Sequence, residues 1–155
     1  MRSYRPIKKI LCALDFSRFS GHTLQQALEL AQGLGAEVVF LNVVNQAMFD
    51  NLERISGRLQ IFEGTLEQAM ATMQEDRAQR LKALLQDHQA HQVPHTSRIA
   101  VGVPWEKILE VAEEEQVDLI VMGTKGRGSL SQRLRFGSSA EKVFRRATCR
   151  VMFVR

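Results

Sequence analysis

A glycine-rich segment follows a short apolar run in the last third of the chain. The run covers residues 117–122, and the segment after it reads GTKGRGS over residues 123–129, with a second motif, GSS, at residues 137–139. Glycines let the backbone approach a ligand within hydrogen-bonding distance, and free N–H groups at a helix start attract anions. Lys125 and Arg127 add positive charge at the same place. These features are typical of a phosphate-binding loop.

Positive charge is concentrated in the same part of the chain. The whole chain has a formal net charge of +4, but residues 123–155 hold nine Lys or Arg against one acid, Glu141, so the remaining residues carry −4. This asymmetry favours a phosphorylated or otherwise anionic ligand. Arg145 and Arg146 are explained more simply as a solvated helix surface. Nucleic acid is not expected, because there is no helix-turn-helix or RNP-like signature and few aromatic residues could stack on bases.

The acidic residues near the loop do not form a catalytic site. Asp118 lies inside the apolar run, and Glu141 stands three residues after Ser138, the spacing of a capping box that starts a helix. The order of a Walker P-loop is absent, and no carboxylate pair is available for a catalytic magnesium ion. We therefore expect a binding protein with slow hydrolysis of its ligand at most.

The cysteines and histidines offer no separate chemistry. Cys12 and Cys149 lie in different apolar runs without a CxxC pattern, so they are interpreted as free buried thiols. His88, His91 and His95 lack a carboxylate or thiol at ligand spacing, and no metal site is expected there.

Alternating apolar strands and amphipathic helices must position the loop. Strands are expected at residues 7–14, 36–44, 96–101, 117–122 and 149–155, and helices at residues 24–34, 66–91, 104–115 and 138–144. The second helix is expected to place its charged residues on a solvated face. The pattern weakens over residues 45–65, where a short helix and mobility are expected.

Five strands separated by helices, without an internal repeat, predict an α/β fold. We expect an open five-stranded parallel sheet with helices on both faces, forming a single domain over residues 1–155. Such sheets bind ligands at the carboxyl ends of their strands, where Asp15 follows the first strand. Asp15 could instead be a turn residue or a helix cap, and the residues alone leave both interpretations open.

The glycine spacing resembles the ATP-binding subgroup of the universal stress protein family. That family's pattern is G-x2-G-x9-G-(S/T), and Gly123, Gly126, Gly137 and Ser138 match it with ten residues instead of nine before the third glycine. The Gly-x-Pro turn at residues 102–104 also recurs in the family, so the resemblance covers nearly the full length.

The resemblance implies the sheet order 3-2-1-4-5, a Rossmann-like fold of the adenine nucleotide alpha hydrolase type. The implied ligand is ATP, or AMP or ADP in the same cleft, with Mg²⁺ at the phosphates. The implied binding residues are Ala13, Asp15 and Val43 for the nucleoside, Met122 and Gly123 for the ribose, and Lys125, Gly126, Gly137, Ser138 and Ser139 for the phosphates.

Two departures from the family pattern keep a second interpretation open. Ala13 stands where ATP-binding members often have proline, and the loop is one residue longer. The alternative is therefore a dimeric interaction module that binds no nucleotide.

The resemblance also implies a regulatory protein of the stress response that acts as a homodimer. The expected contact is the terminal strand, residues 149–154, because an exposed edge strand can pair with a second copy. No apolar run approaches the ~20 residues of a membrane span, and the start of the chain has no cleavable signal, so a cytoplasmic location is expected.

Overall fold

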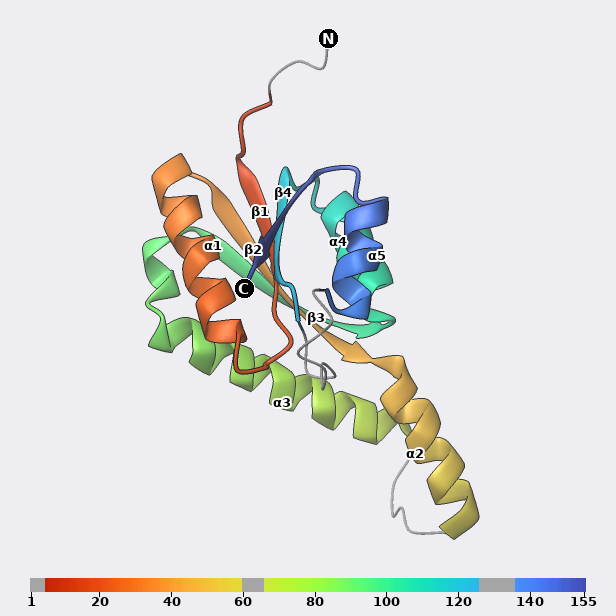
Figure 1. Ribbon diagram of the computed structural model, residues 1–155. Helices are drawn as coiled ribbons and strands as arrows, with labels where there is room; N and C mark the ends of the chain where they lie inside the picture. Colours follow the sequence, from red (N-terminus) through yellow and green to blue (C-terminus); the bar gives the residue numbers. More distant parts are fainter. Residues whose placement is uncertain (1–4, 60–65, 126–135) are drawn as a thin grey trace.

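Five parallel strands form one sheet in the order β3-β2-β1-β4-β5 (Figure 1). The structure is a computed structural model that describes residues 5–59, 66–125 and 136–155. The strands are β1 Lys9–Ala13, β2 Glu37–Asn45, β3 His95–Gly102, β4 Leu119–Gly123 and β5 Arg150–Val154. All four neighbouring pairs are parallel. The predicted fold class and strand order are confirmed.

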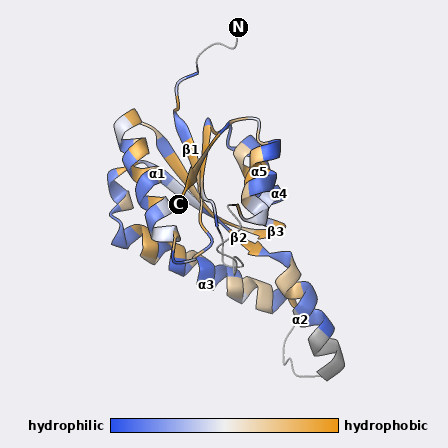
Figure 2. Cartoon of the chain, in the orientation of Figure 1, coloured by the Kyte–Doolittle hydropathy of each residue, from blue (hydrophilic) through white to orange (hydrophobic). Residues whose placement is uncertain are grey.

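Helices cover both faces of this sheet. They are α1 Ser20–Leu34, α2 Gln46–Leu59, α3 Leu66–Asp87, α4 Pro104–Glu114 and α5 Ser138–Arg146, with a 3₁₀ turn at Ala90–Gln92. Helices α1 and α3 pack on one face, and α4 and α5 pack on the other (Figure 1). Figure 2 shows hydrophobic residues along the strands and mixed hydrophobic and hydrophilic residues around the helices, as three layers require.

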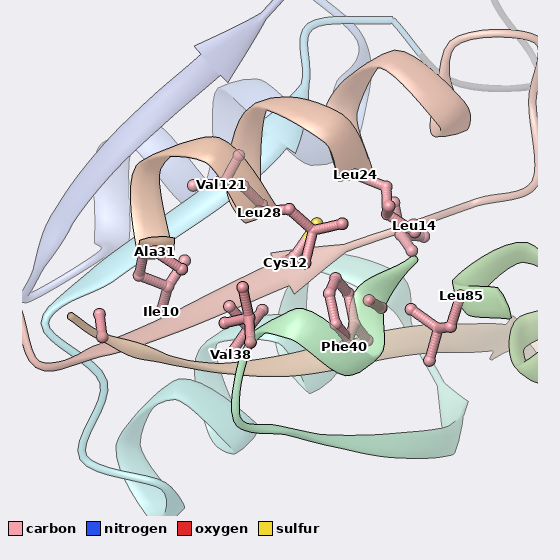
Figure 3. Close-up of a cluster of buried hydrophobic side chains, with 14 of the residues drawn as sticks. Ile10, Cys12, Leu14, Leu24, Leu28, Ala31, Val38, Phe40, Leu85 and Val121 are labelled. Carbon is pink, nitrogen blue, oxygen red and sulfur yellow. The ribbon is translucent and has the colours of Figure 1, made fainter. Parts of the chain in front are cut away.

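The core has two halves because successive side chains of a strand point to opposite faces of the sheet. Ile10 and Cys12 of β1 are fully buried against Leu24 and the rest of the α1 and α3 face (Figure 3). Leu11 points the other way and packs with Val111 of α4. Burial on both faces explains why the strands appear in the sequence as nearly continuous apolar runs.

Local residue choices set several helix ends. Helix α1 stops at Gly35, whose φ of 62° is the left-handed conformation that glycine adopts without a steric penalty. Helix α4 begins at Pro104, as the sequence predicted. Helix α3 ends at Asp87, before the predicted boundary near residue 91, because Gln89 takes the left-handed conformation with a φ of 55°.

The region after β2 contains more helix than the sequence indicated. Residues 46–59 form a fourteen-residue helix, α2, instead of a short one. In Figure 1, α2 and the beginning of α3 project away from the sheet. Phe49 is fully buried and anchors the start of α2 to the domain.

Ion pairs join three of the strands to the C-terminal end of α4. The Lys9 ammonium lies 2.8 Å from a Glu115 carboxylate oxygen and 3.5 Å from Glu37. Arg98 of β3 reaches both Glu114, at 2.9 Å, and Glu115, at 3.1 Å. These contacts tie β1 and β3 to the end of α4.

Asp118, the acid that interrupts the apolar run before the loop, has a backbone role. Its Oδ2 accepts hydrogen bonds from the backbone N–H groups of Lys8, at 2.9 Å, and Lys9, at 3.1 Å. Asp118 therefore fixes the start of β1 beside β4 and lies at the opposite edge of the sheet from the glycine-rich loop.

Candidate functional site at the carboxyl edge of the sheet

Parallel strands end at the same edge of the sheet, and four of the predicted binding residues lie there. Ala13, the last residue of β1, is in register with Leu41 of β2 and Met122 of β4. Val43 lies two residues farther along β2, and Gly123 ends β4. The structure thus brings the residues predicted for the nucleoside and the ribose to adjacent strand ends.

Asp15 follows β1 by two residues and organises the turn into α1. Its Oδ1 accepts hydrogen bonds from the Ser17 N–H, at 2.9 Å, and from the Ser20 hydroxyl, at 3.1 Å. A side-chain oxygen that accepts from the backbone two residues later forms an Asx turn. The turn interpretation of Asp15 is confirmed, and the half-buried carboxylate lies at the carboxyl edge.

Thr124 holds the two ends of the glycine-rich segment together. Its N–H donates to the Val154 carbonyl of β5 at 3.0 Å, and its carbonyl accepts from the Gly137 N–H at 2.6 Å. Thr124 is only 7% exposed. The backbone of Thr124 therefore joins β4, β5 and the start of α5. Thr124 was not among the predicted site residues, although a β-branched residue directly after a buried strand is a signal for burial.

Helix α5 begins at Ser138, one residue earlier than it would if Ser138 were the N-cap. Gly137 is the N-cap, in an extended conformation, and no side chain caps the helix. Glu141 instead pairs with Arg145 at 3.0 Å. The predicted capping box is wrong, because the Gly137 N–H is already bonded to Thr124 and the Gly137 carbonyl accepts from the Glu141 N–H at 3.1 Å.

The first turn of α5 presents amides at the edge of the sheet. Ser138 and Ser139 are its first two residues, and the first N–H groups of a helix lack intrahelical acceptors. The helix dipole adds partial positive charge at this end. Lys125, half-buried, follows Thr124 directly. Gly126 and most of the ten-residue spacer, including Arg127, lie outside the described residues.

The buried amide side chain of Asn42 stabilises the carboxyl edge of the sheet. Its Nδ2 donates to the Leu14 carbonyl at 2.7 Å, so it ties β2 to the residue before Asp15. Asn42 is 1% exposed, and its Oδ1 has no hydrogen-bond partner among the described residues. Asn42 was not among the predicted site residues, although it is the one polar residue within the apolar run at 38–44.

Helix α3 contributes positive charge beside Asp15. Phe16 has a φ of 58°, an uncommon conformation for a bulky residue, and its ring lies under two guanidinium groups. Arg77 is 5.5 Å and Arg80 is 4.7 Å from the ring centroid. Arg77 is only 7% exposed, so the expectation of a solvated charged face is wrong at this position. Cation–π contact with Phe16 helps to compensate its burial.

Other chemical groups are arranged structurally. Cys12 is fully buried and Cys149 half-buried, both are free thiols, and burial raises the pKa of each. Within the described ranges, no group of three or more His, Cys, Asp or Glu side chains could hold a metal ion. No helix in the part of the chain that the structure describes is long and apolar enough to cross a membrane.

Comparison with known proteins gives one consistent result. The model of the universal stress protein family matches residues 6–155. A universal stress protein of Methanocaldococcus jannaschii is 32% identical over 148 residues, which cover 96% of this chain and 82% of the relative.

Solved structures share the fold. A protein of Methanocaldococcus jannaschii, described as hypothetical, superposes with a TM-score of 0.80 at 23% identity, covering 97% of this chain and 96% of that one. A universal stress protein from Archaeoglobus fulgidus in complex with dAMP superposes with a TM-score of 0.64 at 17% identity, covering 97% and 100%. Because the family model spans nearly the whole sequence, this chain belongs to the universal stress protein family.

Proposed function

We propose that this protein binds an adenine nucleotide at the carboxyl edge of the sheet and acts as a regulatory homodimer of the stress response in the cytoplasm. One observation carries the proposal. The hydrogen bond between Gly137 and Thr124 closes the glycine-rich segment, so that the end of β4 and the start of α5 meet at one point. A strand end beside a helix N-terminus is an arrangement that suits a phosphate group.

The roles of the residues follow their positions. Ala13, Asp15 and the backbone of Val43 would contact the nucleoside, because Ala13 and Asp15 end or follow the central strand β1 and Val43 lies near the end of the neighbouring strand β2. Met122 and Gly123, at the end of β4, would lie against the ribose. A carboxylate such as that of Asp15 can accept hydrogen bonds from ribose hydroxyls.

The phosphates would be held by Lys125, Gly126 and the start of α5. The Gly137 N–H already donates to Thr124, so Gly137 would position the loop, and the backbone amides of Ser138 and Ser139 would face the phosphate. With Gly137 as N-cap, the Ser138 hydroxyl makes no capping hydrogen bond.

ATP is the leading ligand, with AMP or ADP as alternatives in the same site. The dAMP complex of a structural neighbour supports an adenine nucleotide. The ligand's own phosphates would supply most of the oxygen ligands for Mg²⁺, which commonly bridges nucleotide phosphates. The proposal includes slow hydrolysis at most.

The proposed dimer contact is β5, with residues 149–154. This strand is an edge of the sheet, and exposed apolar rings lie beside it. Phe153 of β5 contacts the rings of Phe136, at 5.2 Å, and Phe144, at 6.3 Å. Phe144 is 68% exposed. These rings also favour the second candidate function, a dimeric interaction module that binds no nucleotide, because they need a partner surface whether or not the site is occupied.

Calorimetric titration of the purified protein with ATP, ADP, AMP and GTP, each with and without Mg²⁺, tests the proposal. We expect binding of the adenine nucleotides and at least tenfold weaker binding of GTP. Backbone N–H and C=O groups of β2 would pair with the hydrogen-bonding edge of the base, and adenine and guanine differ in the donors and acceptors on that edge. Native mass spectrometry of freshly purified protein should show retained nucleotide. A dimer that binds none of the four nucleotides at millimolar concentration would contradict nucleotide binding and favour the interaction module.

A further inference from the structure

A pocket lies at the amino ends of the strands, at the opposite edge of the sheet from the candidate nucleotide site. Its volume is about 840 Å³. It opens between the C-terminal halves of α4 and α5, and the segments that precede β1, β4 and β5 complete it. In Figure 1 this is the edge from which the N-terminal segment leaves the sheet. Nothing in the proposed nucleotide chemistry uses this pocket, but two of its lining residues, Cys149 and Arg150, also begin the segment proposed as the dimer contact.

The pocket has an apolar floor. Leu109 and Ala112 of α4, Ile120 of β4 and Ala147 after α5 line it, and all four belong to or pack against the core on this face. A ligand with an apolar body would remove this surface from water, which stabilises the complex by about 25 cal/mol per Å² of buried apolar area.

Three arginines surround the floor. Arg5, Arg146 and Arg150 line the pocket from three separate segments. Arg150 donates from its guanidinium to the Arg5 carbonyl at 3.0 Å, which links the N-terminal segment to β5. The Arg146 guanidinium lies 4.7 Å from the centroid of the Trp105 ring. The first contact joins two residues that line the pocket, so it restricts the Arg150 guanidinium before any ligand arrives, and this lowers the entropic cost of binding. Trp105 does not line the pocket, so the Arg146 guanidinium would turn from this ring to meet a ligand.

The acidic residues of the pocket do not cancel this charge. Asp118 lines the pocket, but its Oδ2 accepts the backbone N–H groups of Lys8 and Lys9. Glu113 is exposed on α4. Three arginines therefore line the pocket together with two acidic residues, one of which already accepts two backbone hydrogen bonds.

We propose that this pocket binds a small amphipathic carboxylate, with its apolar body on the floor between α4 and α5 and its carboxylate on the guanidinium groups of Arg146 and Arg150. Planar guanidinium groups pair with carboxylates through two parallel hydrogen bonds, which a single ammonium cannot reproduce. The volume lies within the 300–1,000 Å³ range that is usual for small-molecule sites.

Octanoate is a suitable probe, and the chain offers matched variants. Arg146→Gln and Arg150→Gln each remove one guanidinium from the pocket. Arg145→Gln is the matched control. It removes one positive charge from α5, as Arg146→Gln does, but the Arg145 side chain pairs with Glu141 on the surface and does not line the pocket. Calorimetry gives the affinity for octanoate. Cys149 lines the pocket, so a slower reaction of Cys149 with iodoacetamide shows that octanoate binds there. Cys12 is fully buried and should not interfere.

We expect octanoate to bind the wild type and Arg145→Gln equally and to slow alkylation of Cys149 in both. Arg146→Gln and Arg150→Gln should raise the Kd at least about tenfold, as expected when a charge-assisted hydrogen bond is lost. Octanol lacks the carboxylate and inorganic phosphate lacks the apolar chain, so each should bind at least about tenfold more weakly than octanoate. Millimolar ATP should not displace octanoate.

Four outcomes would overturn this inference: no binding of octanoate at millimolar concentration, equal binding of octanol, equal affinity in all three arginine variants, or competition by ATP. Thermal unfolding of each variant confirms that it is folded before titration. Failure here would leave the nucleotide proposal untouched, because the two sites lie at opposite edges of the sheet.

Discussion

The N–H of Gly137 donates a hydrogen bond to the carbonyl of Thr124 over 2.6 Å, and the N–H of the same Thr124 donates to Val154 at 3.0 Å. One buried residue thus connects the end of β4, the N-terminus of α5 and the C-terminal end of the edge strand β5. The candidate phosphate site and the candidate dimer strand share this connection, so a ligand that orders one has a direct structural route to the other.

Replacing Gly137 by proline should disrupt the site while leaving the backbone conformation allowed. The φ of Gly137 is −73°, which proline adopts, but proline has no N–H to donate to Thr124. A buried carbonyl without its partner costs about 1–3 kcal/mol. We expect a loss of unfolding free energy of that order in urea denaturation and at least tenfold weaker ATP binding in calorimetry.

Gly137→Ala is the matched control, because alanine keeps the N–H and tolerates the same φ. It should bind ATP within about threefold of the wild type. Equal ATP affinity in the proline and alanine variants would show that the Thr124 contact does not organise the site.

Asp15→Ala separates ligand binding from the turn. The substitution removes the hydrogen bonds from Ser17 and Ser20 together with the proposed ribose contact. Ser20→Ala removes only one of the two turn bonds. We expect Ser20→Ala to lower the free energy of unfolding by about 1 kcal/mol with unchanged ATP affinity, and Asp15→Ala to weaken ATP binding at least tenfold. Any slow hydrolysis, followed as ADP accumulation, should disappear in Asp15→Ala. ATP affinity that falls equally in both variants would assign Asp15 to the turn alone.

The sequence predicted the strands well because this sheet is buried on both faces. A run such as residues 117–122 must be apolar on both sides, and few other structures produce that pattern. It also predicted the edge at which Asp15 and Gly123 lie, because parallel strands end together. The strand order 3-2-1-4-5 came from the family resemblance.

The missed features depend on contacts between distant segments. Asn42, Thr124 and Arg77 each act through a partner on another element, and no local pattern encodes that partner. The capping-box spacing at Ser138 was misleading for the same reason. The hydrogen bond that the Gly137 N–H donates to the Thr124 carbonyl fixes Gly137 as the cap, and this tertiary contact overrides the local preference of Ser138.

The ion pairs of Glu115 predict a dependence of stability on pH. A hydrogen bond from Lys9, assisted by its charge and by Arg98, lowers the pKa of Glu115 below its ordinary value of 4.5. A carboxylate with a lowered folded-state pKa contributes stability above its unfolded pKa, and this contribution is lost as the pH falls through the folded pKa. The difference in unfolding free energy between wild type and Glu115→Gln should be about 1 kcal/mol at pH 7 and should vanish at more acidic pH.

Urea denaturation between pH 7 and pH 3 measures this effect. Glu110→Gln is the control, because Glu110 also pairs with a lysine, Lys107 at 2.7 Å, but on a single helix. Its effect at pH 7 should be smaller than that of Glu115→Gln. If Glu115→Gln lowers the free energy of unfolding by the same amount from pH 7 to pH 3, the ionised carboxylate of Glu115 is not the source of the stability.

Phe144 should contribute to self-association. Its ring is 68% exposed and lies beside the edge strand β5, whereas Leu34, 46% exposed, ends α1. Sedimentation equilibrium should show a dimer for the wild type and for Leu34→Arg, and a shift toward monomer for Phe144→Arg. A wild type that is monomeric at micromolar concentration would rule out the proposed dimer.

Backbone amide shifts during a titration with ATP and Mg²⁺ test the central claim most directly. In ¹H–¹⁵N correlation spectra, the account predicts the largest changes at Ser138, Ser139 and Lys125, with little change at Asp118 on the opposite edge. Shifts centred elsewhere, or no shifts at millimolar ATP, would contradict the claim that the start of α5 and the end of β4 together bind the phosphates.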